Sequence, residues 1–259
     1  MMVRDTPLVL DLRAAWTDYM QNHLPGAEWA HNETFRAALG GLPFQLFGED
    51  DYRRLFQRLG VDPGRPVVIY SPGQESDVYA TYVAWLLAGF RHARTYVLDG
   101  GYARWELEGR PMSRTYPRPP PPRPMPGPFA PDTASLADVL AATTGSGALL
   151  VDARNPQQFA GAAGSQRRRG HIPGAINHPW QDDLETRDLA LVWKRPDDLR
   201  AGYVGQGITP DRDIIAYCNT DTEVSHVWFA LRAVLGYPRV RIYVGSWSQW
   251  AERDDLPVE

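Results

Sequence analysis

Residues 214–223 read Ile214-Ile215-Ala216-Tyr217-Cys218-Asn219-Thr220-Asp221-Thr222-Glu223. The first four are apolar, β-branched or aromatic, and so short a run predicts a buried strand. Apolar residues then recur at helical spacing through residues 224–235, which predicts a helix ended by Gly236. Cys218 therefore falls at a strand-to-helix turn, where converging backbone N–H groups favour negative charge. We expect its thiol to be shifted toward the thiolate, the form that attacks sulfur or carbon.

The composition is that of a globular protein with one large domain or two ordinary ones. The chain has 259 residues, 43% of them hydrophobic, and a formal net charge of −4. No basic stripe dominates it, which argues against nucleic acid as a partner. No apolar run is as long as a membrane span, and the first residues lack the apolar core of a signal peptide. We therefore expect no membrane association and a cytoplasmic location.

Cys218 is the single cysteine of the chain. An internal disulfide and a cysteine-cluster metal site are thereby excluded. A lone cysteine is often only a small buried hydrophobe, but its place at a strand-to-helix turn favours a reactive thiol. Because there is no resolving thiol, any group that Cys218 takes up must leave to an external acceptor.

Further strands are predicted at residues 8–12, 67–70 and 95–98, with helices between them. From residue 117 to residue 131, nine of fifteen residues are proline. Such a segment can be neither helix nor central strand, so it is predicted to be an extended linker between two domains.

The second half of the chain repeats the landmarks of the first. Both halves contain the same four landmarks in the same order. These are a run ending in Asp-x-Arg, a His-x-Pro-Gly-Ala segment, a strand with its loop, and a glycine with a tryptophan five residues after it. His23 and Ser71 are 48 residues apart, and His171 and Cys218 are 47 apart. From the start of each loop to the glycine the separations are 29 and 27 residues. The repeat predicts two tandem α/β domains, each a mostly parallel sheet with helices on both faces.

These motifs resemble the rhodanese family of sulfurtransferases over nearly the whole chain. The resemblance rests on the segment Gly170-His171-Ile172-Pro173-Gly174-Ala175, the Cys218 loop, the Asp152-Ala153-Arg154 strand end and Gly245-Ser246-Trp247. It is nearest to two-domain thiosulfate or 3-mercaptopyruvate sulfurtransferases. It implies a silent N-terminal domain over residues 1–113 with Ser71 at the cysteine position, a linker over 114–131 and a catalytic domain over 132–259.

The resemblance also implies the chemistry. The Cys218 thiolate would take a sulfur atom from a small donor, become a persulfide, and pass the sulfur to cyanide, a thiol or a protein acceptor. No metal or organic cofactor is implied. Substrate-binding candidates, besides the catalytic Cys218, are the loop residues Asn219, Thr220, Asp221, Thr222 and Glu223, with Arg168, Arg169 and Trp247. Asp152 and Arg154 are expected to support the strand end.

The loop departs from the family pattern. Members of this type usually carry a basic residue or glycine there, whereas this loop has Asp221 and Glu223 and no base. A carboxylate about 8 Å from a bound anion costs roughly 2 kcal/mol at an effective dielectric constant near 20. Either the acidic side chains cap the helix and point to solvent, or they select another donor or acceptor. Gln158 stands where many members have a substrate-binding arginine, for which residues 167–169 offer a replacement, and Val244 stands where the family often has aspartate.

Several alternatives remain open at this stage. His226 is either a general base or a packed helix residue, and Trp247 either walls the pocket or belongs to the core. A cysteine phosphatase would need an arginine that closes the loop, and Val224 occupies that region. A binding or regulatory module that has lost efficient catalysis would explain the acidic loop.

Overall fold

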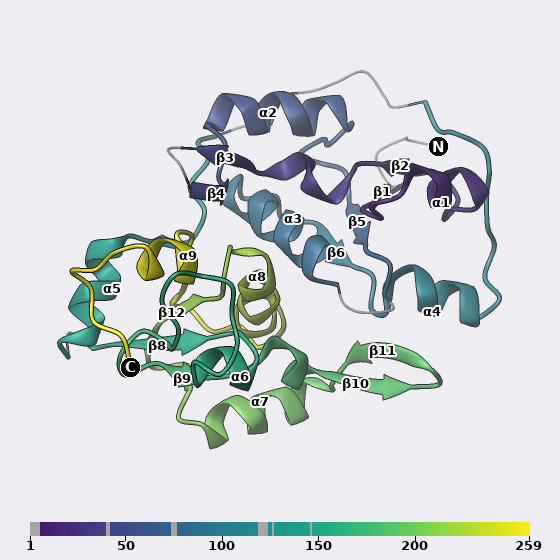
Figure 1. Ribbon diagram of the computed structural model, residues 1–259. Helices are drawn as coiled ribbons and strands as arrows, with labels where there is room; N and C mark the ends of the chain where they lie inside the picture. Colours follow the sequence, from purple (N-terminus) through teal and green to yellow (C-terminus); the bar gives the residue numbers. More distant parts are fainter. Residues whose placement is uncertain (1–5, 40–41, 74–76, 119–123, 126, 146) are drawn as a thin grey trace. The chain divides into compact units, whose positions relative to one another are not determined.

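The computed structural model describes residues 6–39, 42–73, 77–118, 124–125, 127–145 and 147–259 (Figure 1). These residues form two compact units. The first comprises residues 1–37, 46–131 and 186–193, and the second comprises residues 38–45, 132–185 and 194–259. Residues 119–123 and 126 of the proline-rich segment lie outside the described residues.

The elements of the first half alternate between strands and helices. In chain order they are β1 (Leu8–Asp11), α1 (Trp16–Gln21), β2 (Ala27–Trp29), the 3-10 helix η2 (Asn32–Phe35), β3 (Ala37–Leu39), β4 (Leu42–Gln45), α2 (Glu49–Arg58), β5 (Val67–Tyr70), α3 (Val78–Gly89), β6 (Thr95–Val97) and α4 (Gly101–Leu107).

The second half follows the same plan with a longer middle section. Its elements are β7 (Thr133–Ala134), α5 (Leu136–Thr143), β8 (Ala148–Asp152), α6 (Pro156–Phe159), β9 (Ile176–Asn177), the 3-10 helix η3 (Trp180–Asp183), β10 (Leu184–Arg187), β11 (Ala190–Trp193), α7 (Pro196–Gly205), β12 (Asp213–Tyr217), α8 (Thr222–Trp228), the π-helix η4 (Phe229–Val234), β13 (Val240–Tyr243) and α9 (Ser246–Ala251).

The two main sheets share one topology. The first has the strand order β2-β1-β5-β6, and the second has β7-β13-β12-β8-β9. All their described pairings are parallel, with Leu10 opposite Ile69 in one sheet and Val151 opposite Ala216 in the other. The order β9-β8-β12-β13 matches β2-β1-β5-β6 element by element. The predicted parallel α/β repeat is therefore confirmed.

Helices cover both faces of the second sheet, and the side chains of its strands point alternately to the two faces. On one face, Ile215 and Tyr217 of β12 belong to a buried cluster with Val139 of α5 and Trp250 of α9. Ile214 and Ala216 point the other way and are also fully buried. Because both faces are covered, the strand reads as a continuous apolar run.

The predicted helix over residues 224–235 differs from the observed one. It starts two residues earlier, at Thr222, and changes at Phe229 from an α-helix to a π-helix. The Leu235 N–H donates to the Ala230 carbonyl, a step of five residues. The wider turn rotates the apolar face, so that Val234 is left 36% exposed although its spacing assigned it to the core.

Two glycines with positive φ provide a test of how tightly the strand ends are packed. A Cβ at Gly101 (φ +52°) would lie 2.4 Å from the Ser71 carbonyl oxygen, whereas one at Gly174 (φ +77°) meets nothing within 4 Å. We expect Gly174→Ala to lower the free energy of unfolding by about 1–2 kcal/mol, the cost of a left-handed alanine. Gly101→Ala should cost a further ~1–3 kcal/mol because the backbone must shift.

Denaturant unfolding followed by circular dichroism measures both variants. Gly174→Ala is the matched control, since it has the conformational cost without the collision. Equal losses for the two variants would contradict the close approach of Gly101 to Ser71.

Candidate active site

Cys218 follows the last residue of β12 and has no exposed surface. The backbone N–H groups of Thr220 and Val224 donate hydrogen bonds to its sulfur. Its own carbonyl accepts from the Trp247 N–H at 2.9 Å, and its N–H donates to the Ser246 hydroxyl at 3.4 Å. The loop therefore wraps the sulfur, while α9 holds the backbone of the cysteine.

The expected shift of Cys218 toward thiolate is wrong for the resting loop. Burial, together with the charges of Glu223 and Asp221, raises the pKa of the thiol to about 12, against the N–H groups of Val224 and Thr220. Removing a thiolate from water costs more than two hydrogen bonds return. At pH 7 the Cys218 thiol is therefore protonated.

The acidic residues of the loop do not point to solvent. Asp221 is fully buried, precedes α8 and has φ +77°, a left-handed conformation that only short polar residues and glycine adopt readily. Glu223 is partly buried, and its Oε2 atom has no hydrogen-bond partner among the described residues. Burial raises the Glu223 pKa, and the charge of Asp152 adds to this. The interpretation of these residues as solvated helix caps is therefore wrong.

Asp152 and Arg154 form one buried ion pair beside the loop. The Arg154 Nη2 atom lies 2.6 Å from Asp152 Oδ2 and also donates to the Gly170 carbonyl at 2.8 Å. The guanidinium lies over the Trp247 ring, 4.7 Å from its centroid. Trp247 itself is 1% exposed and belongs to the core cluster. Because its backbone holds Cys218 and its ring contacts Arg154, Trp247 connects the ion pair to the cysteine.

The other loop residues lie at the edge of this site. Asn219 and Thr220 are partly exposed, and the Asn219 side-chain amide donates to Gln158 Oε1 at 3.5 Å. Thr222 is 6% exposed, and its hydroxyl contacts Asp221 Oδ1 at 3.5 Å. Gln158 is therefore close to the loop, as its position in the sequence suggested.

The arginines at residues 167–169 have different surroundings. Arg167 pairs with Asp254 at 2.5 Å, and Arg168 donates to the carbonyls of Arg253 and Leu256. Arg169 is exposed. The recorded contacts of Arg167 and Arg168 are thus with the C-terminal segment and not with the Cys218 loop, and the substrate-binding role of Arg168 and Arg169 stays a prediction.

A buried network behind α8 was not found by sequence reasoning. His178 lies 3.0 Å from Asp183, which also accepts from the Tyr203 hydroxyl at 2.7 Å. His226 is fully buried, 3.6 Å from Asp183, with its ring edge-on to Trp180. His226 is therefore a packed helix residue in this structure. The available signal was a histidine and two aspartates within residues 178–183, but their burial is set by α7 and α8.

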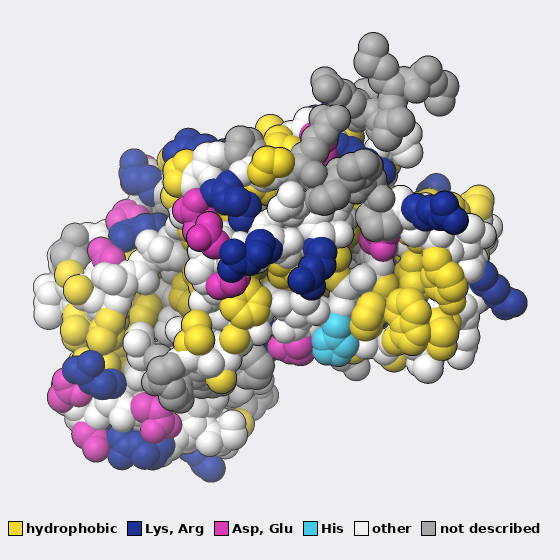
Figure 2. Space-filling model, turned by 90° about the horizontal axis from the view of Figure 1, so that it is seen from above, with side chains coloured by type: hydrophobic (Ala, Val, Ile, Leu, Met, Phe, Trp, Pro, Cys, Tyr) yellow, Lys and Arg dark blue, Asp and Glu magenta, His cyan; other side chains and the backbone are white. Residues whose placement is uncertain are grey.

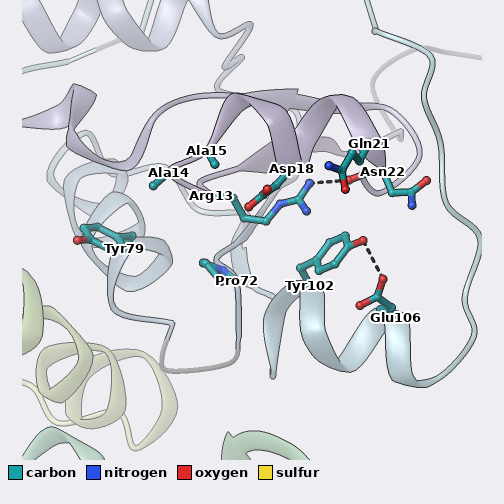
Figure 3. A pocket seen from close by; sticks show the side chains of 10 residues that line it. All are labelled: Arg13, Ala14, Ala15, Asp18, Gln21, Asn22, Pro72, Tyr79, Tyr102 and Glu106. Carbon is teal, nitrogen blue, oxygen red and sulfur yellow. Dashed lines mark hydrogen bonds between the residues drawn. The ribbon is translucent and has the colours of Figure 1, made fainter.

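The first half has the same arrangement of contacts, but Ser71 stands in the position of Cys218. Arg13 pairs with Asp11, and the Tyr102 N–H donates to the Ser71 carbonyl at 3.0 Å, as Trp247 does to Cys218. Ser71 is fully buried, and its hydroxyl accepts from the Ala80 N–H at 3.0 Å. A pocket of about 530 Å³ lies beside it (Figure 3), lined by Arg13, Ala14, Ala15, Asp18, Gln21, Asn22, Pro72, Tyr79, Tyr102 and Glu106.

The described surface carries charges of both signs. On the face drawn in Figure 2, basic and acidic side chains are interspersed, without a continuous basic stripe among the residues in colour. Within the described part of the chain, the helices are too short or too polar to cross a membrane.

Comparison with known proteins identifies the fold and the family. The sequence profile of the Rhodanese-like domain matches residues 1–108 and again residues 135–253. This chain belongs to the rhodanese family. The two matches agree with the repeated frame around Ser71 and Cys218.

Known sulfurtransferases are similar to this rhodanese over most of its length. A putative thiosulfate sulfurtransferase of Synechococcus elongatus is 36% identical, over 97% of this chain and 79% of the relative. The 3-mercaptopyruvate sulfurtransferase of Escherichia coli K12 is 30% identical, over 93% of this chain and 85% of the relative. The crystal structure of YnjE superposes with a TM-score of 0.85 at 20% identity. That match covers 99% of this chain and 62% of YnjE, and it shows the shared fold.

The raised pKa of Cys218 predicts how the thiol responds to pH. Because thiolate alone reacts with iodoacetamide, labelling at pH 7 should be about a thousandfold slower than for an unperturbed thiol. The rate should rise about tenfold per pH unit from pH 7 to 9.5, since the pKa lies above that range. Intact mass reports labelling at this single site, and a small free thiol in the same buffers is the control. A plateau below pH 9 would contradict the raised pKa.

Proposed function

We propose that this protein is a sulfurtransferase that moves a sulfane sulfur from thiosulfate or 3-mercaptopyruvate to a thiophilic acceptor through a persulfide on Cys218. The observation that carries the proposal is the position of the only thiol. Cys218 stands at the carboxyl end of a central parallel strand, and its sulfur accepts hydrogen bonds from two backbone N–H groups. The family membership and the names of the relatives support the same reaction.

The reaction proceeds in two displacements. The Cys218 thiolate attacks the outer sulfur of the donor, a new S–S bond forms, and the donor leaves with the electron pair of the broken bond. The N–H groups of Thr220 and Val224 are placed to stabilise the anionic persulfide. A second nucleophile, such as cyanide, a thiol or a protein thiol, then attacks the outer sulfur and restores the Cys218 thiolate.

The two halves are proposed to have different roles. The first half, residues 1–113, would be silent in catalysis because Ser71 replaces the cysteine and its hydroxyl is occupied by the Ala80 N–H. Residues 114–131 would be the linker and residues 132–259 the catalytic domain. A cytoplasmic location stays a prediction from the sequence.

Intact mass after incubation with each donor tests this function. Wild-type protein should gain one sulfur atom with thiosulfate or with 3-mercaptopyruvate, and cyanide should remove it. Cys218→Ser should gain none, because a hydroxyl is a far poorer nucleophile toward sulfur. Ser71→Ala is the matched control in the other half and should load as the wild type does.

A folded protein with a titratable thiol that gains no sulfur from either donor would contradict the proposal. That result would favour a binding or regulatory module, in which the buried, protonated Cys218 is only part of the core.

A further inference from the structure

The pocket beside Ser71 has no part in the proposed sulfur transfer. It lies within the first unit and has a volume of about 530 Å³, which is typical of small-molecule sites. One side is formed by residues 13–22, which include α1, and another by α4, while Pro72 and Tyr79 complete the lining (Figure 3). The charges and apolar groups of this lining decide which ligand fits.

Arg13, a basic residue that lines the pocket, is already neutralised. Its Nη2 atom lies 2.7 Å from Asp11 Oδ2 and donates to the Asn22 carbonyl at 2.7 Å, and its Nε atom also binds Asp11. The guanidinium lies over the Tyr102 ring, 4.0 Å from the ring centroid. Because Arg13 is only 5% exposed, these contacts hold it in the wall. A cation paired in this way offers little net charge to an incoming anion.

Two carboxylates leave the pocket negative. Asp18 of α1 and Glu106 of α4 both line it, both are exposed, and neither forms an ion pair among the described residues. Glu106 accepts a hydrogen bond from the Tyr102 hydroxyl at 3.1 Å, which leaves its charge in place. In the view of Figure 3, the Arg13 guanidinium and Tyr102 lie between the two acids. Since Asp11 cancels the charge of Arg13, the charges of Asp18 and Glu106 remain without compensation.

The rest of the lining favours an organic cation over a metal ion. Divalent ions such as Ca²⁺ need several oxygen ligands, and among the described residues no three His, Cys, Asp or Glu side chains are grouped to hold one. The pocket instead presents the ring of Tyr79 and the methyl groups of Ala14 and Ala15. An alkyl chain can pack on such apolar groups while its charged end reaches a carboxylate.

We propose that this pocket binds a short aliphatic diamine, with one ammonium group at Asp18 and the other at Glu106. The two carboxylates stand on different helices, so a ligand with two cationic ends neutralises both. The first half is then a binding domain in its own right, and this role goes beyond the sulfur transfer proposed for Cys218.

Isothermal titration calorimetry with three four-carbon probes tests the charge of the ligand. Butane-1,4-diamine carries two positive charges at pH 7, because alkylamines lose their proton only near pH 10, whereas butane-1,4-diol is neutral and succinate is a dianion. At low ionic strength the diamine should bind about 25-fold more tightly than the diol, the product of about fivefold for each exposed ion pair. Succinate should not bind. Added salt should weaken diamine binding, since exposed charges are screened.

Variants of the two acids test the location of the site. Asp18→Asn and Glu106→Gln should each weaken diamine binding about fivefold, and the double variant about 25-fold. Both side chains are exposed, so the variants should fold. Asp50→Asn removes an exposed carboxylate of α2 outside the pocket and is the matched control, which should bind as the wild type does. Cys218→Ser should also bind unchanged, which separates this inference from the sulfurtransferase proposal.

Equal binding of the diamine and the diol would overturn the inference, because charge would then not select the ligand. Tighter binding of succinate would also overturn it and would make Arg13 the group that recognises the ligand. A loss of affinity in Asp50→Asn equal to that in Asp18→Asn would show that the amine binds the surface at large. A folded wild-type chain that does not bind the diamine would contradict the proposal outright.

Discussion

The buried ion pair between Asp152 and Arg154 supports the arrangement of the whole active site. Both side chains are almost without exposed surface, and an unpaired charge at such a depth would cost several kcal/mol. The pair is retained because its geometry satisfies the groups involved: the guanidinium binds both carboxylate oxygens and the Gly170 carbonyl. It thereby ties the end of β8 to the segment before His171, and its contact with Trp247 extends this to the residue that holds Cys218. The equivalent pair, Asp11 and Arg13, joins the same strand end to the Asn22 carbonyl in the first half.

Around Cys218, desolvation outweighs the local dipoles. Two backbone N–H groups favour the thiolate, but a fully buried sulfur beside two carboxylates is more stable as the thiol. Without a bound donor, the site therefore holds the unreactive thiol. A sulfur donor can react there only once the thiol proton has been removed.

The two halves share the same backbone contacts at the end of the central strand, although only the second half has a thiol there. In both, the residue after the central strand is held by an N–H group from the helix that follows the last strand. In the second half that residue is a thiol whose only recorded donors are backbone N–H groups. In the first half it is Ser71, whose hydroxyl accepts a hydrogen bond from the Ala80 N–H. A pocket lined by Arg13 and Tyr102, among other residues, lies beside Ser71 (Figure 3). The first half also contains a buried acid: burial and the charge of Asp99 raise the pKa of Asp77 to about 7.

The sequence by itself determined the repeat, the parallel α/β architecture and the position of Cys218 at a strand end, because these follow from apolar periodicity and from landmarks at fixed spacing. The contact of Gln158 with the loop also agreed with its sequence position. The protonation of Cys218, the burial of Asp221 and Glu223, and the attachment of Arg168 to the C-terminal segment were decided by the tertiary structure. So were the π-turn at Phe229 and the network of His178, Asp183 and His226. Each depends on how much water neighbouring segments exclude, and those segments lie far away in the sequence; periodicity carries no information about desolvation at a single atom.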